Sequence, residues 1–345
     1  MSGFKRYFSV DEALFEFKKR IQESKDFNEI NTLESLNRIT YENIYSRLDL
    51  PPENRSVVDG FAVRSIDVSG ASPSNPIQLE IIDRISAGEK FYSTLKKDQA
   101  VEIYTGGIMP KGADCVLMAE DCVKEKEKLI VMKQCFKYQN VSRKGEDFSI
   151  NDIVIKKGTL IEPFHIGALV SLGIKNIKVY RRAKVSIIST GSELKDFNDY
   201  KEGIIDSTRP MLISMVKRAN LDALDLGIVK DDKDEIIKKL KEALNNSDMV
   251  VISGGTSLGN YDLVPESIEE IAKPGIVIHG IAMRPARTTG IAFNNKIPIL
   301  MVSGFPVAAY ISFNLFLREF IKLFYGTNLL PCLLYTSPSP RDGLL

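Results

Sequence analysis

The sequence has no tryptophan, only two histidines and four cysteines among its 345 residues. The cysteines include no Cys-x-x-Cys pair, so neither a zinc site nor a disulfide scaffold is expected. The chain also has no large excess of positive or negative charge, because 46 basic and 45 acidic residues leave a net charge of +1. This balance gives no electrostatic reason to expect binding to nucleic acid or to an anionic membrane.

Long apolar runs are also missing. No uninterrupted apolar segment is long enough to cross a bilayer, and residues 1–7 lack the apolar centre of a signal peptide. We therefore expect a cytoplasmic protein. Hydrophobic residues make up 44% of the chain, which at this length allows a sizeable core divided over two or three domains.

The pattern of apolar residues changes along the chain. A capping box at Ser9 predicts a first helix. From about residue 51 to 182, short apolar runs separated by glycine and proline predict strands with few helices. From residue 184 onward strands and helices alternate, which is typical of a three-layer α/β domain with a mostly parallel sheet. We expect an elongated, β-rich N-terminal region over 1–181, in which two subdomains could interleave, and an α/β domain over 182–326.

The turn after the predicted strand 249–252 is the most informative segment. Glycines there let backbone N–H groups approach an anion closely, and the start of the next helix adds the positive end of its dipole. A tight turn without a ligand is the alternative. The candidate anion-binding residues are Ser253, Gly254, Gly255, Thr256, Ser257 and Gly259.

Carboxylates occur in several loops predicted at one edge of this sheet. Ligands of parallel sheets bind at the carboxyl ends of the strands, and oxygen ligands suit Mg²⁺. The pattern therefore predicts a Mg²⁺-assisted site for a phosphorylated ligand. A single carboxylate of this kind is more often a helix cap or a solvated loop residue than a metal ligand, and Asp232 in particular is a candidate N-cap. The carboxylates are Glu193, Asp206, Asp232 and Asp262.

Several ordered motifs over roughly residues 11–326 resemble the molybdopterin molybdenumtransferase family, which is also similar to the larger, C-terminal domain of gephyrin. The motifs are Val57–Arg64, Thr105–Asp114, Arg143–Asp147, Ser189–Leu194, Asp206–Ser207 and Ser253–Asp262. The resemblance implies the last step of molybdenum cofactor assembly. In that step adenylylated molybdopterin and molybdate are the substrates, Mg²⁺ assists hydrolysis of the pyrophosphate link, and AMP is released.

The resemblance also implies roles for individual residues. Asp59 and Thr105, from the β-rich part, are expected to approach the partner's pocket in a homodimer, and a contact with the adenylyltransferase of the same pathway is a further expectation. The implied catalytic residues are Asp59, Thr105, Glu193, Asp232 and Asp262, and the implied Mg²⁺ ligands are Glu193, Asp206 and Asp262.

Molybdate is a dianion and needs cations or N–H donors. Arg284 and Arg287 fit this need and stand in a segment where many relatives have lysines. Ser303 and Gly304 are expected at the cofactor, while Phe305 replaces the asparagine of the relatives' Pro-Gly-Asn-Pro-type turn. Tungstate has nearly the same size and charge as molybdate, so the sequence does not separate the two oxyanions.

The resemblance ends near residue 326, and we expect the family's final small β domain to be absent. The tail 327–345 is expected to be an artefact, because from Cys332 it resembles translated vector or adapter sequence; a genuine short tail is the alternative. Two other functions stay open. One is a scaffold that binds molybdopterin without catalysis, and a weaker one is a molybdopterin adenylyltransferase, which shares the Gly-Gly loop but is usually the α/β domain alone.

Overall fold

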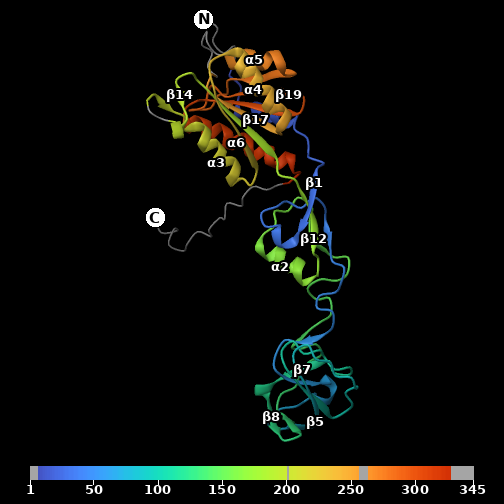
Figure 1. Ribbon diagram of the computed structural model, residues 1–345. Helices are drawn as coiled ribbons and strands as arrows, with labels where there is room; N and C mark the ends of the chain where they lie inside the picture. Colours follow the sequence, from blue (N-terminus) through green and yellow to red (C-terminus); the bar gives the residue numbers. More distant parts are fainter. Residues whose placement is uncertain (1–6, 200–201, 256–262, 328–345) are drawn as a thin grey trace. The chain divides into compact units, whose positions relative to one another are not determined.

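The computed structural model describes residues 7–199, 202–255 and 263–327 (Figure 1). The chain forms two compact units, each described separately. The α/β unit comprises Met1–Glu42, Lys157–Glu162 and Asn176–Leu345, and the β-rich unit comprises Asn43–Lys156 and Pro163–Lys175. Among the described residues, no helix is both long and apolar enough to cross a membrane.

The α/β unit is built on a six-stranded sheet. Its order is β16 (Asp222–Val229), β13 (Lys184–Thr190), β17 (Met249–Ser253), β20 (Ile297–Val302), β19 (Gly290–Asn294) and β18 (Pro274–His279). The first four strands are mutually parallel, whereas β19 is antiparallel to both neighbours. The mostly parallel sheet predicted from the sequence is confirmed.

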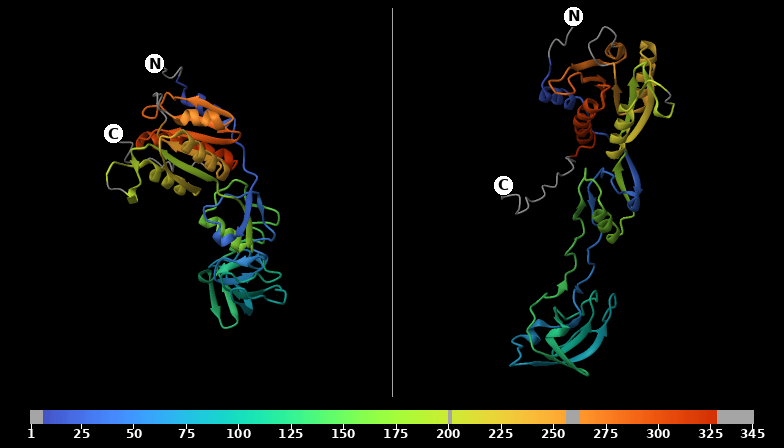
Figure 2. Two further views of the ribbon diagram at one scale, coloured as in Figure 1. Left: turned by 45° about the horizontal axis from the view of Figure 1, so that its top comes forward. Right: turned by 90° about the vertical axis from the view of Figure 1, so that its left-hand side faces the viewer.

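Helices cover both faces of this sheet, giving three layers (Figures 1 and 2). On one face α1 (Val10–Lys18), α3 (Thr208–Arg218) and α6 (Pro306–Phe324) share a core that includes Phe17, Phe313 and Phe316. On the other face lie α4 (Lys233–Asn246) and α5 (Leu263–Ile271). Helix α4 buries one apolar stripe, formed by Ile236, Ile237, Leu240, Ala243 and Leu244.

The N-terminal residues belong to the α/β unit. The predicted capping box forms, since Ser9 Oγ accepts the Glu12 N–H at 3.1 Å and the Glu12 carboxylate accepts the Ser9 N–H at 2.7 Å. Phe17 packs on Phe316 with 5.1 Å between ring centroids. In addition β1 (Phe27–Asn31) pairs with β12 (Asn176–Tyr180). The compact units therefore do not follow a single division after residue 181, because burial of α1 and this strand pairing join distant segments.

The β-rich unit contains a second six-stranded sheet. Its order is β7 (Cys115–Met118), β4 (Gly60–Val63), β6 (Gln99–Ile103), β5 (Ile77–Ile85), β9 (Lys128–Val131) and β8 (Cys122–Glu125). Two short pairs, β2 (Ile44–Tyr45) with β11 (Ile153–Ile155) and β3 (Arg55–Ser56) with β10 (Val141–Ser142), and the helix α2 (Pro163–Ser171) complete it. The β-rich character predicted for this part is confirmed.

Candidate functional site

Parallel strand order brings the predicted loops to one edge of the α/β sheet. Strands β16, β13, β17 and β20 end at this edge, and β18 ends there too, because it is antiparallel to β19, which is itself antiparallel to β20. Neighbouring loops are bonded together: the Gly191 N–H donates to the Val229 carbonyl, and the Gly254 N–H donates to the Val302 carbonyl, both at 3.1 Å. We call this the carboxyl edge.

The glycine turn after β17 has the conformation that glycine favours. Gly254 and Gly255 have φ values of +87° and +56°, in the left-handed region. A Cβ on Gly254 would lie 2.4 Å from the Thr190 carbonyl oxygen, and one on Gly255 would lie 2.9 Å from Val264 Cγ2. The turn therefore excludes side chains through contacts within the protein. Because the Gly254 N–H is bonded to Val302, it is not free to bind an anion.

Two hydroxyl groups that the sequence analysis left without a role hold the loops together. Thr190 Oγ1 donates to the Ser253 carbonyl at 3.4 Å. Thr208 Oγ1, at the start of α3, donates to the Gly304 carbonyl at 2.6 Å. A Cβ on Gly304 would in turn lie 3.8 Å from Gly254 Cα. The β17 and β20 loops thus form one packed surface.

The hydroxyl groups of Ser253 and Ser303 both make hydrogen bonds within the protein. Ser253 is 2% exposed and its hydroxyl lies 2.9 Å from the Ser189 hydroxyl. Ser303 Oγ accepts the Phe305 N–H at 3.2 Å. The remaining predicted residues of the glycine turn, Thr256, Ser257, Gly259 and Asp262, lie outside the described residues.

The carboxylates of the predicted site that the structure describes have different hydrogen-bonding roles. Asp232 caps α4, since its Oδ1 accepts the Glu235 N–H at 2.9 Å. Its neighbour Asp231, which the sequence analysis did not single out, accepts the Ser192 N–H at 2.9 Å and donates its own N–H to Ser192 Oγ at 3.1 Å. The Asp-Asp pair thus joins the β16 loop to the β13 loop and also begins a helix.

Asp206 is buried and paired with Arg209. It is 3% exposed, its Oδ1 accepts the Arg209 N–H at 3.1 Å, and its Oδ2 accepts Nε–H at 3.0 Å. Arg209 also contacts Asp196, which follows β14 (Leu194–Lys195), and Asp225 on β16. Burial lowers the pKa of Arg209, but the hydrogen bonds that its guanidinium donates to these carboxylates outweigh burial and raise the pKa above its ordinary value. A Mg²⁺ ion at Asp206 would compete with Arg209 for the carboxylate oxygens. The geometry therefore favours a structural role for Asp206, as the partner of Arg209, over a role as a metal ligand.

Glu193 is the described carboxylate best placed for a metal. It is exposed at the carboxyl edge, three residues after β13, and its oxygens lie 2.9 and 3.0 Å from where a Gly191 Cβ would be. Within the described ranges, no group of three or more His, Cys, Asp or Glu side chains could hold a metal by itself. Mg²⁺ usually takes one or two carboxylates together with substrate phosphates, so Glu193 fits such a shared site.

Arg284 and Arg287 follow β18 at the same edge. Both are exposed, and the Arg287 guanidinium lies 5.8 Å from the centre of the Tyr7 ring. The Arg287 carbonyl accepts the Ile281 N–H at 3.0 Å, which folds the segment back on itself. Strands β20 and β19 separate β18 from β17, so the arginine segment begins about 14 Å across the sheet from the glycine turn.

Asp59 and Thr105 form a pair in the β-rich unit. Asp59 Oδ1 accepts the Thr105 N–H at 2.8 Å and the Thr105 hydroxyl at 2.7 Å. These two bonds, the backbone one first, lower the pKa of Asp59, so it stays ionised at neutral pH. Both residues are exposed. The sequence predicted each as a site residue, but not the bond between them.

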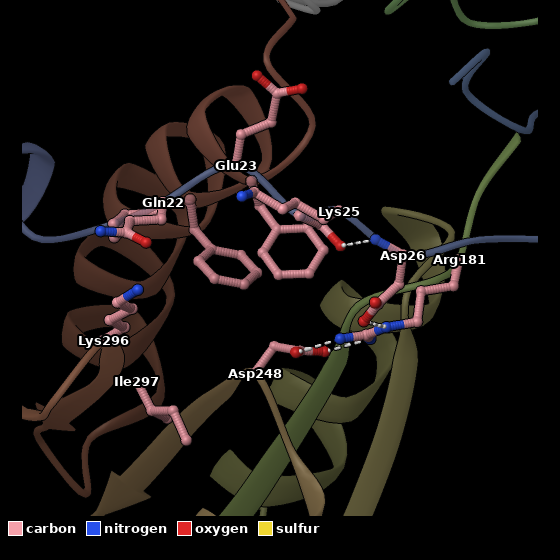
Figure 3. Close-up of a pocket in the computed structure, with 12 residues that line it drawn as sticks. Gln22, Glu23, Lys25, Asp26, Arg181, Asp248, Lys296 and Ile297 are labelled. Atoms are coloured by element: carbon pink, nitrogen blue, oxygen red, sulfur yellow. Dashed lines mark hydrogen bonds and ion pairs between the residues drawn. The ribbon is translucent and has the colours of Figure 1, made fainter. Parts of the chain in front are cut away.

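A cavity of about 340 Å³ lies at the opposite, amino edge of the α/β sheet (Figure 3). Phe320, Phe324 and Ile297 line its apolar part. Its main charges pair with one another, since Arg181 donates to both oxygens of Asp248 at 2.7 and 2.6 Å and to Asp26 at 2.9 Å. Of the predicted site residues that the structure describes, none lines this cavity.

Comparisons with known proteins agree with the geometry. Residues 8–173 match the family described as the MoeA N-terminal region (domain I and II), and residues 186–323 match a probable molybdopterin binding domain. The chain is 37% identical over 294 residues to a molybdopterin molybdenumtransferase of Staphylococcus aureus, covering 85% of this chain and 70% of that protein. It is 36% identical over 323 residues to one of Staphylococcus epidermidis, covering 93% and 76%.

A solved structure gives the same result. The crystal structure of the molybdopterin biosynthesis MoeA protein from Pyrococcus horikoshii superposes with a TM-score of 0.83 at 29% identity, covering 94% of this chain and 81% of that one. Sequence, domain order and fold agree over most of the chain, and the resemblance read from the motifs is confirmed. The chain belongs to the molybdopterin molybdenumtransferase (MoeA) family.

Proposed function

We propose that the protein is a molybdopterin molybdenumtransferase that inserts molybdate into adenylylated molybdopterin and releases AMP in the last step of molybdenum cofactor assembly. The observation that carries the proposal is the convergence of the family's motifs at one sheet edge. The glycine turn after β17, the Ser303–Gly304 loop and Glu193 all follow strands that end there. Such an edge is where α/β sheets bind ligands.

The charges at the carboxyl edge suit these substrates. Glu193 would hold Mg²⁺ together with phosphate oxygens of the substrate, and the bound ion would stabilise negative charge developing at the pyrophosphate. Arg284 and Arg287 supply the positive charge that a molybdate dianion needs. Tungstate would fit the same donors, so we expect tungstate to compete with molybdate for the site.

A carboxylate-to-amide change at Glu193 tests the proposal. We expect Glu193→Gln to lower the rate of AMP release at least tenfold, while the affinity for molybdopterin changes little, because the lost charge acts mainly where negative charge develops. The measurement is AMP formed from adenylylated molybdopterin with molybdate and Mg²⁺. Asp232→Asn is the matched control: asparagine caps helices as well as aspartate, so a residue that only caps α4 would tolerate it.

The same assay separates the alternatives. Tight binding of molybdopterin by the parent protein without AMP release would support a scaffold instead of an enzyme. Consumption of ATP with bare molybdopterin would support an adenylyltransferase. A Glu193→Gln variant as active as the parent would remove Glu193 from the reaction, and a large loss in Asp232→Asn would give Asp232 a part in catalysis.

We further propose that the protein is a homodimer in which each site draws on both subunits, and that it receives its substrate from the adenylyltransferase of the pathway. The exposed Asp59–Thr105 pair supports the shared site, because both side chains are fixed by hydrogen bonds yet face solvent. In a two-fold dimer such a contact occurs twice.

Subunit mixing tests the shared site. Equal amounts of Asp59→Asn and Glu193→Gln subunits, allowed to exchange, should recover about a quarter of the parent activity, because half of the dimers are mixed and each mixed dimer has one intact site. Subunit exchange is verified by mass spectrometry of tagged chains. If the mixture stays as inactive as its two parents after exchange, each site is built from one subunit.

A further inference from the structure

Phe305 occupies a position where folding alone gives no reason for an aromatic residue. It is the N-cap of α6, with φ −77° and ψ 123°, and its side chain makes no capping hydrogen bond. Ser, Thr, Asp and Asn are strongly preferred at N-caps, because their side chains satisfy free N–H groups of the first helical turn. The Phe305 side chain instead remains 79% exposed. Neither capping nor packing accounts for it.

The backbone around Phe305 is held in place beside the glycine turn. The Phe305 N–H donates to Ser303 Oγ at 3.2 Å, and the Gly304 carbonyl accepts Thr208 Oγ1 at 2.6 Å. A Cβ on Gly304 would lie 3.8 Å from Gly254 Cα. Val307, in the first turn of α6, is 67% exposed as well. An ordered loop thus presents an aromatic ring and an apolar neighbour at the carboxyl edge.

We propose that the Phe305 ring is a stacking surface for a flat conjugated heterocycle of the substrate. This inference rests on the proposed function, whose substrate carries two such rings, a pterin and an adenine. Planar heterocycles stack on exposed aromatic side chains, and each such contact is worth about 1–3 kcal/mol on replacement by alanine, or roughly 5- to 150-fold in affinity. Gly255 and Phe305 would then contact different parts of one ligand.

The absence of tryptophan from the chain provides a direct measurement. Phe305→Trp introduces a single tryptophan, which can be excited selectively over the 12 tyrosines and whose emission should be quenched when a heterocycle stacks on it. Phe164→Trp is the matched control, because Phe164 is 66% exposed on α2 of the β-rich unit. Titration with molybdopterin and, separately, with AMP tells which ring stacks. Quenching of Phe305→Trp by neither compound, although the parent protein binds one of them, would overturn the proposal.

Three further variants separate stacking from a structural role. We expect Phe305→Ala to weaken binding of the stacked compound roughly 5- to 150-fold, while Phe305→Tyr stays near the parent. Phe305→Asn should weaken binding equally and yet raise the midpoint of thermal unfolding by about 2–4 °C, because asparagine restores the missing cap. Lower affinity with higher stability is a combination that a packing role would not produce.

The remaining outcomes have clear meanings. If Phe305→Ala binds both compounds as the parent does but forms fewer dimers in sedimentation velocity, the ring belongs to a contact between copies of the chain and the stacking proposal is wrong. If calorimetry shows that the parent protein binds neither molybdopterin nor AMP, the proposed function itself fails. The calorimetric result for the parent therefore distinguishes failure of the function from failure of the stacking.

Discussion

Replacing Arg209 by methionine is expected to lower the free energy of unfolding by about 3–5 kcal/mol, the usual cost of removing one partner from a buried ion pair. The Arg209 side chain is only 6% exposed, and Asp206 beside it is 3% exposed. Without the guanidinium, Asp206 would be a buried carboxylate with its main partner gone. The change would also free the loop that carries Asp196 from the start of α3. Urea denaturation followed by circular dichroism measures the loss.

An exposed ion pair provides the control for this prediction. Lys239 lies 2.9 Å from Glu242 on the solvent side of α4, with 35% and 45% of the two side chains exposed. Pairs of this kind contribute about 0–1 kcal/mol, so Lys239→Met should unfold almost as the parent does. An Arg209→Met variant no less stable than Lys239→Met would show that the three aspartates do not depend on the guanidinium.

The architecture of the α/β unit could be predicted because its signals are local. The apolar run of β17 and the helical spacing of α4 each depend on a few neighbouring residues, and parallel strands must share an edge. The shared edge is enough to predict from the sequence that Glu193, Ser253 and Ser303 lie at the same side of the sheet. The capping box at Ser9 was readable for the same reason, since its two hydrogen bonds join residues three apart.

The contacts that decide the role of each carboxylate join residues far apart in the sequence. Asp225 meets Arg209 across 16 residues, and Ser192 meets Asp231 across 39. No periodicity shows such pairings. The bond between Asp206 and Arg209 is the exception, because it spans three residues and could have been expected at a helix start. From the sequence Asp206 is predicted to be a metal ligand, and its bonds to Arg209 favour a structural role instead.

The division of the chain into its two compact units could not be predicted from the sequence, for a related reason. The strand 27–31 pairs with 176–180, so the chain passes through the β-rich unit and returns. A reading along the sequence assigns α1 to the part that directly follows it. The apolar face of α1 indicates that it is buried, but not which core buries it. Contact with Phe316 settles this.

The glycine turn should be the least tolerant element of the carboxyl edge. We expect Gly254→Ala to reduce the affinity for molybdopterin by one to four orders of magnitude, since strain at φ +87° and the 2.4 Å approach to the Thr190 carbonyl would each cost about 1–3 kcal/mol. The clash with the Thr190 carbonyl on β13 would push the turn toward the β20 loop, because β17 lies between these two strands, and this would displace the N–H groups of the turn. Binding is measured by isothermal titration calorimetry with molybdopterin.

Gly227 makes it possible to separate the two causes. Its φ is +78°, close to that of Gly254, but no atom lies within 4 Å of where its Cβ would be. Gly227→Ala thus introduces the backbone strain without the steric clash, and lies on β16 rather than in the glycine turn. It should lower stability by about 1–3 kcal/mol and leave the affinity nearly unchanged. If Gly254→Ala keeps the parent affinity while it remains folded, the turn is a structural feature of the sheet edge and the phosphate is bound elsewhere.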